Sequence, residues 1–298
     1  MGTTVTVLLP HATSHLGTTA REVFHTWEDR LSRFLPDSEL SRLNHRSGQE
    51  VAVSQLLFKV VDAALSAAVA TDGVFDPTLL TQIRAIGYDR AFDAIEPAGL
   101  STYQPMPGGR WPEIRLDLRR QTIRLPSGIG LDLGGIAKGM AVDATAAMLT
   151  DAGVNCAAVD AGGDLAVVGI PPGYESWPIE VETPGQPHVV SLRRGALATS
   201  GVGRRLWQQN GLPRHHLIDP RTGLPVDNNV WSASVATASC REAEIAAKVT
   251  LILGQAEGTR FLERHGWPGL IVLKDGPRIQ AGPWSPRPAG IGCSRQAT

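Results

Sequence analysis

LDLGGIAKGMAVD, residues 131–143, is the stretch around which the rest of the chain is organised. Its pattern is typical of the end of a strand, a two-glycine turn and the start of an amphipathic helix. A helix N-terminus directs unpaired backbone N–H groups and the positive end of the helix dipole to one point, and Lys138 adds a full positive charge there. The stretch therefore predicts an anion site. By itself it leaves open the alternative that the glycines only make a tight connection.

Composition places the chain among soluble globular proteins. It has 298 residues, of which 42% are hydrophobic and 19% charged. That length allows one large domain or two ordinary ones. The net charge is −1, from 28 basic and 29 acidic residues. A chain whose charges balance so closely has no broad basic surface for nucleic acid or anionic lipid, although a local basic patch is compatible with this composition. We expect no nucleic-acid partner.

The cysteines and the N-terminal sequence predict a cytoplasmic protein. Cys156, Cys240 and Cys293 are scattered and match neither a disulfide framework nor a zinc spacing, which favours a reducing compartment. The first basic residue is Arg21, so no basic segment precedes an apolar one as in a signal peptide. No apolar run reaches membrane-spanning length, and we expect no membrane insertion.

Helical and strand-like segments are mixed without regular βαβ alternation, which predicts an α+β fold. Capping patterns place helix starts at Thr19 with Glu22, at Ser54, and at Ser239 with Glu242. The last of these helices should end before Gly254, and a further helix should run to His265. Strand-like runs are expected at residues 3–9, 113–118, 122–126, 157–159, 165–170, 179–182, 189–192, 230–237 and 269–273.

Three polar turns bounded by glycines could carry chemistry. They are DAGGD at residues 160–164, ALATSG at 196–201 and HHLIDPRTG at 215–223. Each alone is more typical of a structural turn, because Asp, Thr, Ser and Gly satisfy local backbone groups. Together they predict a ligand with several polar parts that lies across many loops.

With these motifs in place, the chain resembles the ApbE-type FAD:protein FMN transferases, a family of flavin transferases. The resemblance runs from Met1 nearly to Leu273. It rests on MGT at the N-terminus, SELSRLN (38–44), DGVFDPT (72–78), LDLGGIAKGMAVD, DAGGDL, ALATSG and HLIDPRTG, in this order. Ordered motifs over most of a chain are far more specific than one glycine loop.

The resemblance implies an α+β architecture related to the T-fold, with a mainly antiparallel sheet and an extended cleft for FAD. It implies transfer of the FMN half of FAD to a Thr or Ser hydroxyl of a flavin-accepting target protein, with release of AMP and with dependence on Mg²⁺. It leaves the acceptor and the oligomeric state open. Two alternatives remain: a non-catalytic FAD-binding protein, and an FAD pyrophosphatase in which water replaces the hydroxyl and yields FMN and AMP.

We expect one domain over residues 1–282, an arrangement that includes two subdomains meeting at the FAD cleft, and a disordered tail over residues 283–298. The chain opens directly on the family's MGT motif. Many members of the family act outside the cytoplasm. Either the acceptor of this chain is cytoplasmic, or the true start lies upstream.

The resemblance also assigns site residues. Gly134, Gly135 and Lys138 would hold the diphosphate, and Gly135 matches the position whose backbone carbonyl binds the metal in the family. His216 matches the histidine of the HxIDPxTG motif and is the predicted base for the target hydroxyl. Asp219 on the same turn would orient it. Further residues in the matching motifs would line the flavin or its ribityl and adenosine arms: Met1, Asn44, Asp76, Asp160, Asp164, Thr199 and Ser200.

Two positions of one helix depart from the family pattern. After the cysteine of the late helix the family carries an Asp and, four residues later, a Thr, and both side chains bind Mg²⁺. Aligned on Cys240 and Gly254, these positions hold Glu244 and Lys248. An ammonium group cannot bind a metal ion. A Glu followed four residues later by Lys is also a common surface ion pair of helices.

Two interpretations of this departure stay open. In the first, Lys248 supplies the positive charge itself, fixed by Glu244, in a site that binds metal weakly or not at all. In the second, Glu244, the Gly135 carbonyl and phosphate oxygens still hold Mg²⁺, an ion that proteins often bind through one or two carboxylates. We favour the weakened metal site.

Overall fold

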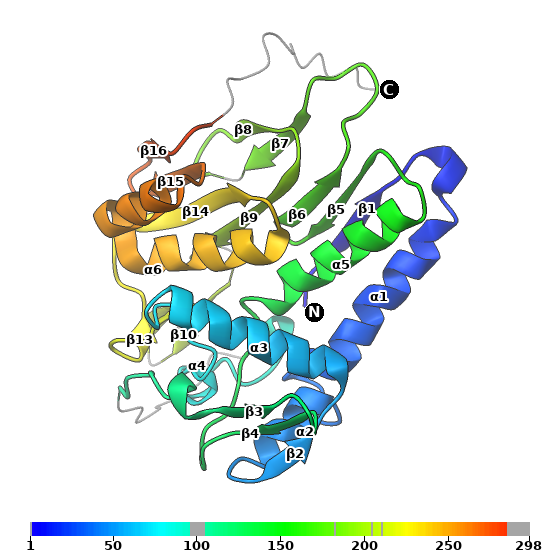
Figure 1. The fold of residues 1–298 in the computed structure, drawn as a ribbon. Helices are drawn as coiled ribbons and strands as arrows, with labels where there is room; N and C mark the ends of the chain where they lie inside the picture. Colours follow the sequence, from blue (N-terminus) through cyan, green and yellow to red (C-terminus); the bar gives the residue numbers. More distant parts are fainter. Residues whose placement is uncertain (1, 96–104, 182, 204, 210, 285–298) are drawn as a thin grey trace.

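The computed structural model describes residues 2–95, 105–181, 183–203, 205–209 and 211–284. Its centre is a seven-stranded sheet in which every neighbouring pair is antiparallel (Figure 1). The strand order is β1 (Val5–Leu8), β5 (Ala157–Ala161), β6 (Asp164–Val168), β9 (Gly195–Gly201), β14 (Val230–Thr237), β15 (Gly269–Leu273) and β16 (Arg278–Ala281). The expected α+β class with a mainly antiparallel sheet is confirmed.

Both faces of this sheet are covered. Helices α5 (Ala137–Asp151) and α6 (Cys240–His265) pack on one face, and α1 (Leu16–Leu31) lies beside α5 (Figure 1). The hairpin of β7 (Trp177–Val181) and β8 (His188–Leu192) covers the other. Strand β5 shows the alternation that this requires, since Ala157 and Val159 belong to the helix-side core and Ala158 to the hairpin-side cluster.

A second group of elements packs below the helices (Figure 1). It contains α2 (Glu39–His45), α3 (Gln55–Ala70), α4 (Leu80–Ala85) and a three-stranded sheet in the order β2 (Glu50–Ala52), β4 (Thr122–Arg124) and β3 (Arg115–Asp117). Short turns and ribbons complete it: η2 (Phe92–Ala94), η3 (Trp111–Glu113), β10 (Leu206–Gln209), β11 (Leu212–His215), β12 (Ile218–Asp219) and β13 (Leu224–Pro225). The turn η1 (His11–Thr13) instead joins β1 to α1.

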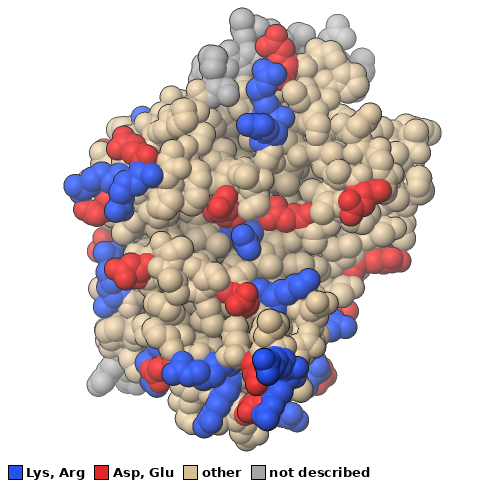
Figure 2. All heavy atoms as spheres, in the orientation of Figure 1, with Lys and Arg blue, Asp and Glu red and all other residues tan. Residues whose placement is uncertain are grey.

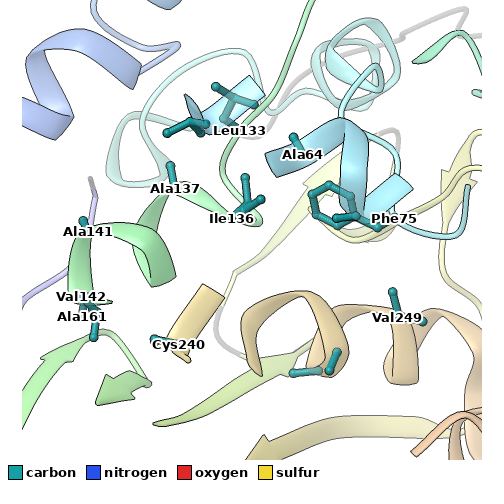
Figure 3. Packing of buried hydrophobic residues seen from close by; sticks show 14 of the residues in the cluster. Ala64, Phe75, Leu133, Ile136, Ala137, Ala141, Val142, Ala161, Cys240 and Val249 are labelled. Atoms are coloured by element: carbon teal, nitrogen blue, oxygen red, sulfur yellow. The ribbon is translucent and has the colours of Figure 1, made fainter. Parts of the chain in front are cut away.

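The start of α5 is fixed by packing. Leu133, Ile136 and Ala137 are buried, and Figure 3 shows them close to Ala64 of α3 and to Phe75. Full burial of an apolar side chain of this size stabilises the fold by roughly 2 kcal/mol. The glycine turn is therefore held between the upper and lower groups of elements.

The helix starts agree with two of the three capping predictions. The hydroxyls of Ser54 and Ser239 accept hydrogen bonds from Leu57 N (3.2 Å) and Glu242 N (3.3 Å). The prediction at Thr19 was wrong, because the turn η1 leads straight into α1 and the helix already begins at Leu16. Within α6, Gly254 has φ +78° and breaks the helix where the sequence predicted an end.

Figure 2 shows the charged side chains on one face of the molecule. Both signs of charge are scattered over the face in Figure 2, with Lys and Arg gathered beside acidic residues at its lower end. Among the described residues, no helix is long and apolar enough to cross a membrane.

Trp284, near the start of the expected tail, donates from Nε1 to the Gly269 carbonyl (2.8 Å) and packs on the hairpin-side cluster. The rest of that tail, residues 285–298, lies outside the described residues.

Candidate active site

A cleft of about 770 Å³ lies where the start of α5, the first half of α6 and the ends of β5, β6 and β9 meet. Most of the predicted site residues line it: Gly134, Lys138, Asp160, Asp164, Thr199, Ser200, His216, Glu244 and Lys248. Gly135 and Asp76 line a small hollow that shares His216 and Lys248 with the cleft. The motifs that are scattered in the sequence are thus brought to one place.

Lys138 is held by two buried carboxylates. Its Nζ lies 2.8 Å from Asp164 Oδ2 and forms an ion pair with Glu244 Oε1, and it donates to the Gly134 carbonyl (3.2 Å). The second oxygen of Glu244 accepts from Gly139 N (2.8 Å). The carboxylates of Asp164 and Glu244 are each 4% exposed. This arrangement fixes α6 to the first turn of α5.

Lys138 and the neighbouring carboxylates shift each other's pKa. Burial alone would lower the pKa of Lys138, but Asp164 and Glu244 outweigh it and raise that pKa. Burial, together with repulsion from Glu244, raises the pKa of Asp164 to about 7 although Lys138 opposes the change. Lys138 therefore stays charged and has its donors occupied by the protein itself.

The first N–H of the glycine turn is also occupied. Asp132 Oδ1 accepts from Gly134 N (2.7 Å), and Asp132 Oδ2 lies 2.7 Å from Arg33 Nε. Arg33 donates from Nη1 to the Tyr88 carbonyl (2.8 Å). The sequence interpretation missed Asp132 and Arg33. An Asp two residues before a glycine was a local signal for the first, and no local signal pointed to the second.

Lys248 occupies a different environment. Its ammonium lies directly against Gly135, since a Cβ built on that glycine would come within 1.9 Å of Lys248 Nζ. The ring centroid of Phe75 is 5.8 Å away. Burial lowers the pKa of Lys248, while Asp132 and Glu244 oppose that change. Within the described part of the chain no hydrogen bond or ion pair to Lys248 is formed, and the expected pair with Glu244 is absent because Glu244 binds Lys138 and Gly139 instead.

His216 lies between the cleft and the small hollow. Its ring packs edge-on against Tyr88 at a centroid distance of 6.1 Å. Its Nδ1 is buried and finds no hydrogen-bond partner among the described residues. Burial, with nearby Arg205 and Lys248, lowers the pKa of His216 well below its usual range. The imidazole is therefore neutral near pH 7 and able to accept a proton.

Asp219 is placed differently from the expectation. Its Oδ1 accepts from Arg221 N (2.9 Å), and its Oδ2 pairs with Arg221 Nη2 (2.7 Å). No hydrogen bond or ion pair with His216 is formed among the described residues, and Asp219 is absent from the described lining of the cleft. Arg221 holds the carboxylate in its own turn, so the structure gives Asp219 a structural partner.

The remaining predicted residues divide between lining and support. Thr199 Oγ1 lies 2.8 Å from Ser234 Oγ at the cleft, and Asp160 Oδ1 accepts from Gly163 N (2.9 Å). Asp76 joins two chain segments, because its carboxylate accepts hydrogen bonds from Thr78 N (2.7 Å) and Gly109 N (2.6 Å).

Asn44 and Met1 stand apart from this lining. Asn44 pairs with the backbone of Leu131, accepting from its N–H (2.7 Å) and donating to its carbonyl (3.0 Å), which ties the central stretch to α2. It does not contact the cleft in the described structure. Met1 lies outside the described residues.

The far end of the cleft is apolar. It lies between the sheet and β7, and its lining is mainly apolar: Leu8, Ala158, Leu165, Leu197, Pro178, Ile179 and Val181, with Thr6 and Glu180 among them. The sequence interpretation missed this end, because it depends on where the hairpin folds over the sheet. A cleft with one charged and one apolar end suits a ligand that joins an anionic group to a flat apolar ring.

Comparison with known proteins gives a consistent result. The model of the ApbE family matches residues 1–271. An FAD:protein FMN transferase of Vibrio cholerae is 30% identical over 257 residues, which are 83% of this chain and 75% of the relative. One from Treponema pallidum is 30% identical over 272 residues, with coverage of 84% and 75%.

Solved structures agree with this fold. The flavin transferase ApbE from Vibrio cholerae superposes with a TM-score of 0.79 at 26% identity, covering 94% of each chain. The ApbE protein of Thermotoga maritima gives a TM-score of 0.79 at 24% identity, with coverage of 94% of this chain and 92% of that one. At that identity the second match supports the fold alone.

Proposed function

Because this chain belongs to the ApbE family, we propose that it is an FAD:protein FMN transferase. The enzyme takes FAD as substrate, attaches its FMN half to a Thr or Ser hydroxyl of an acceptor protein, and releases AMP. The observation that carries this proposal is the single cleft that combines the motifs of five separate segments with an apolar end. Relatives that bear this activity in their names cover most of the chain.

The reaction is one displacement at phosphorus. The acceptor hydroxyl oxygen forms a bond to the phosphorus of the FMN half, the bond from that phosphorus to the bridging oxygen breaks, and its electron pair leaves on the phosphate of AMP. His216 accepts the hydroxyl proton, which its lowered pKa permits near neutral pH. Most of the catalysis in such a transfer comes from positioning and electrostatic stabilisation.

The charged end of the cleft would surround the diphosphate. Lys138, with its carboxylates, holds the first turns of α5 and α6 in place. Lys248 extends from α6 to Gly135 at the glycine turn. The hydroxyls of Thr199 and Ser200 would reach the ligand from β9. Each of these groups comes from an element whose position the core fixes.

The residues present do not fit the two-side-chain magnesium site that the resemblance implies. One expected ligand is Lys248. The other, Glu244, already gives one oxygen to Lys138 and the other to Gly139 N. Among the described residues no group of three or more His, Cys, Asp and Glu side chains could hold a metal. We propose that Mg²⁺ has at most a weak role here.

Location and organisation remain predictions. We propose a cytoplasmic location, and the scattered cysteines of the sequence are the support for it. A single domain over residues 1–282 is likewise our proposal, with the cleft between its upper and lower groups of elements.

A transfer assay tests the proposal. The protein is mixed with FAD and a purified flavin-accepting domain, and the acceptor band is examined for flavin fluorescence after denaturing electrophoresis. An acceptor whose target Thr is replaced by Val is the matched control. A fluorescent band with the intact acceptor alone is expected. AMP release without an acceptor would instead indicate a pyrophosphatase, and FAD binding with neither product would indicate a binding protein.

A further inference from the structure

We propose that the Lys248 ammonium binds the diphosphate of FAD directly, as the cation of this site, so that FAD binding by this chain needs no divalent metal ion. The inference rests on the proposed function, because it assumes that FAD occupies the cleft. It assigns to Lys248 a role that follows from contacts in the folded protein.

The cations of the cleft differ in what they already bind. Three Lys or Arg residues line it in the described structure: Lys138, Arg205 and Lys248. Lys138 is neutralised by Asp164 and Glu244. Arg205 donates from Nη2 to the Gly2 carbonyl (3.3 Å). Of the three, Lys248 alone has no hydrogen bond or ion pair with the described residues. Its three N–H donors are therefore available to a ligand.

A partly buried charge without a bonded partner needs one. Removing an ammonium from water is unfavourable unless an opposite charge or hydrogen-bond acceptors compensate. Asp132 and Glu244 act on Lys248 only through their nearby charge, and no described residue forms a hydrogen bond or ion pair with it. Phosphate oxygens would, and hydrogen bonds between charged partners are the strong ones. The free protein thus keeps a cation ready for an anionic ligand.

This cation lies at the start of a helix. Lys248 Nζ lies against Gly135, at the turn that begins α5. A side chain at position 135 would occupy the space of the ammonium, since a Cβ there would lie 1.9 Å from Nζ and 2.7 Å from Cε. The absence of a side chain at Gly135 thus makes room for the Lys248 ammonium beside the helix start.

A metal ion would not take the place of the Lys248 ammonium. Each nearby carboxylate is already engaged: Glu244 by Lys138 and Gly139, Asp164 by Lys138, and Asp132 by Gly134 N and Arg33. A divalent ion would have to replace these contacts and sit beside two ammonium groups. These carboxylates neutralise Lys138 and leave Lys248 as the ammonium at the glycine turn that has no bonded partner among the described residues.

FAD binding measured without turnover tests this inference. FAD and riboflavin, which has no phosphate, are titrated into the full-length protein by calorimetry, in EDTA and in Mg²⁺. The wild type should bind FAD equally well in both. Lys248→Met should weaken FAD binding by about 10- to 100-fold, the effect of losing charge-assisted hydrogen bonds, and should leave riboflavin binding unchanged. Lys248→Arg should retain most of the affinity for FAD.

Two further variants separate charge from folding. Gly135→Ala keeps the ammonium but displaces it, and should weaken FAD binding while riboflavin binding stays. Lys248→Thr should make FAD binding depend on Mg²⁺ more than in the wild type. Thermal unfolding of Lys248→Met should show no loss of stability, because the variant removes a charge that has no partner in the described protein.

The outcomes distinguish this inference from the proposed function. Wild-type FAD binding that requires Mg²⁺, or Lys248→Met binding FAD as tightly as the wild type, overturns the role of Lys248 and leaves the transferase proposal standing. Equal losses for FAD and riboflavin in Lys248→Met also overturn it, because they indicate a general collapse of the cleft. If the wild type binds no FAD under either condition, both proposals fail.

Discussion

Gly139→Ala tests the junction between the two helices that carry the site. Gly139 lies in the first turn of α5, where a Cβ would come within 2.7 Å of Cys240 O, 2.8 Å of Cys240 C and 2.9 Å of Arg241 N. These are backbone atoms of α6. They cannot move freely, because Asp143 accepts hydrogen bonds from Cys240 N (2.7 Å) and Arg241 N (2.9 Å). The helices must therefore separate to admit the methyl group.

The magnitude follows from two opposing effects. Overpacking against three fixed backbone atoms should destabilise the fold by about 3 kcal/mol, the upper end of the usual range. Replacing a helical glycine by alanine returns about 1 kcal/mol of helix propensity. The expected net loss in the free energy of unfolding is therefore about 2 kcal/mol. The shift also moves Glu244 and Lys248, so FAD affinity should fall as well.

Gly17→Ala is the matched control. Gly17 lies in α1, and a Cβ there meets nothing within 4 Å. The same substitution should therefore raise the free energy of unfolding by up to about 1 kcal/mol. Urea-induced unfolding followed by circular dichroism measures both variants. If Gly139→Ala proves as stable as the wild type, the close contact between α5 and α6 does not exist as described and the reasoning fails.

Three further predictions concern single side chains. His216→Ala should slow transfer at least about 100-fold while FAD binding is retained, and because burial lowers the pKa of His216, the wild-type rate should not fall as the pH drops from about 8 to about 6.5; a pH–rate profile checks this. Asn44→Ala leaves the Leu131 N–H and carbonyl without their partner and should lower the free energy of unfolding by about 2 kcal/mol in urea. Asp164 has its pKa raised from 3.8 to about 7, so the folded state keeps a proton that the unfolded state loses, and its contribution to stability declines as the pH rises through that range. Asp164→Asn should remove this decline, as seen by comparing the pH dependence of unfolding in the two proteins.

Local features of the fold could be predicted from the sequence because their signals are local. Ser54 and Ser239 cap the turns that follow them, and Gly254 breaks a helix through its own backbone conformation. Thr19 carries the same capping pattern as Ser239 but lies inside α1, since the preceding turn η1 had already started the helix. A capping pattern predicts a start only where the chain before it is not already helical.

The motifs predicted which residues gather at the cleft, but not their contacts. Glu244 and Lys248 have the spacing of a helix ion pair, and the sequence offered no reason to separate them. In the folded protein Lys138 of α5 takes Glu244, and Lys248 is left facing Gly135. Such exchanges of partner depend on how two helices pack, and residues distant in sequence decide them. The pair of Arg33 with Asp132 is another example.

Covalent transfer of FMN is the central claim, and intact-mass spectrometry of the acceptor tests it most directly. The protein is incubated with FAD and a flavin-accepting domain in the presence of EDTA. We predict that the acceptor gains the mass of one FMN group and that an equal amount of AMP appears. An acceptor of unchanged mass, with or without added Mg²⁺, would contradict the account.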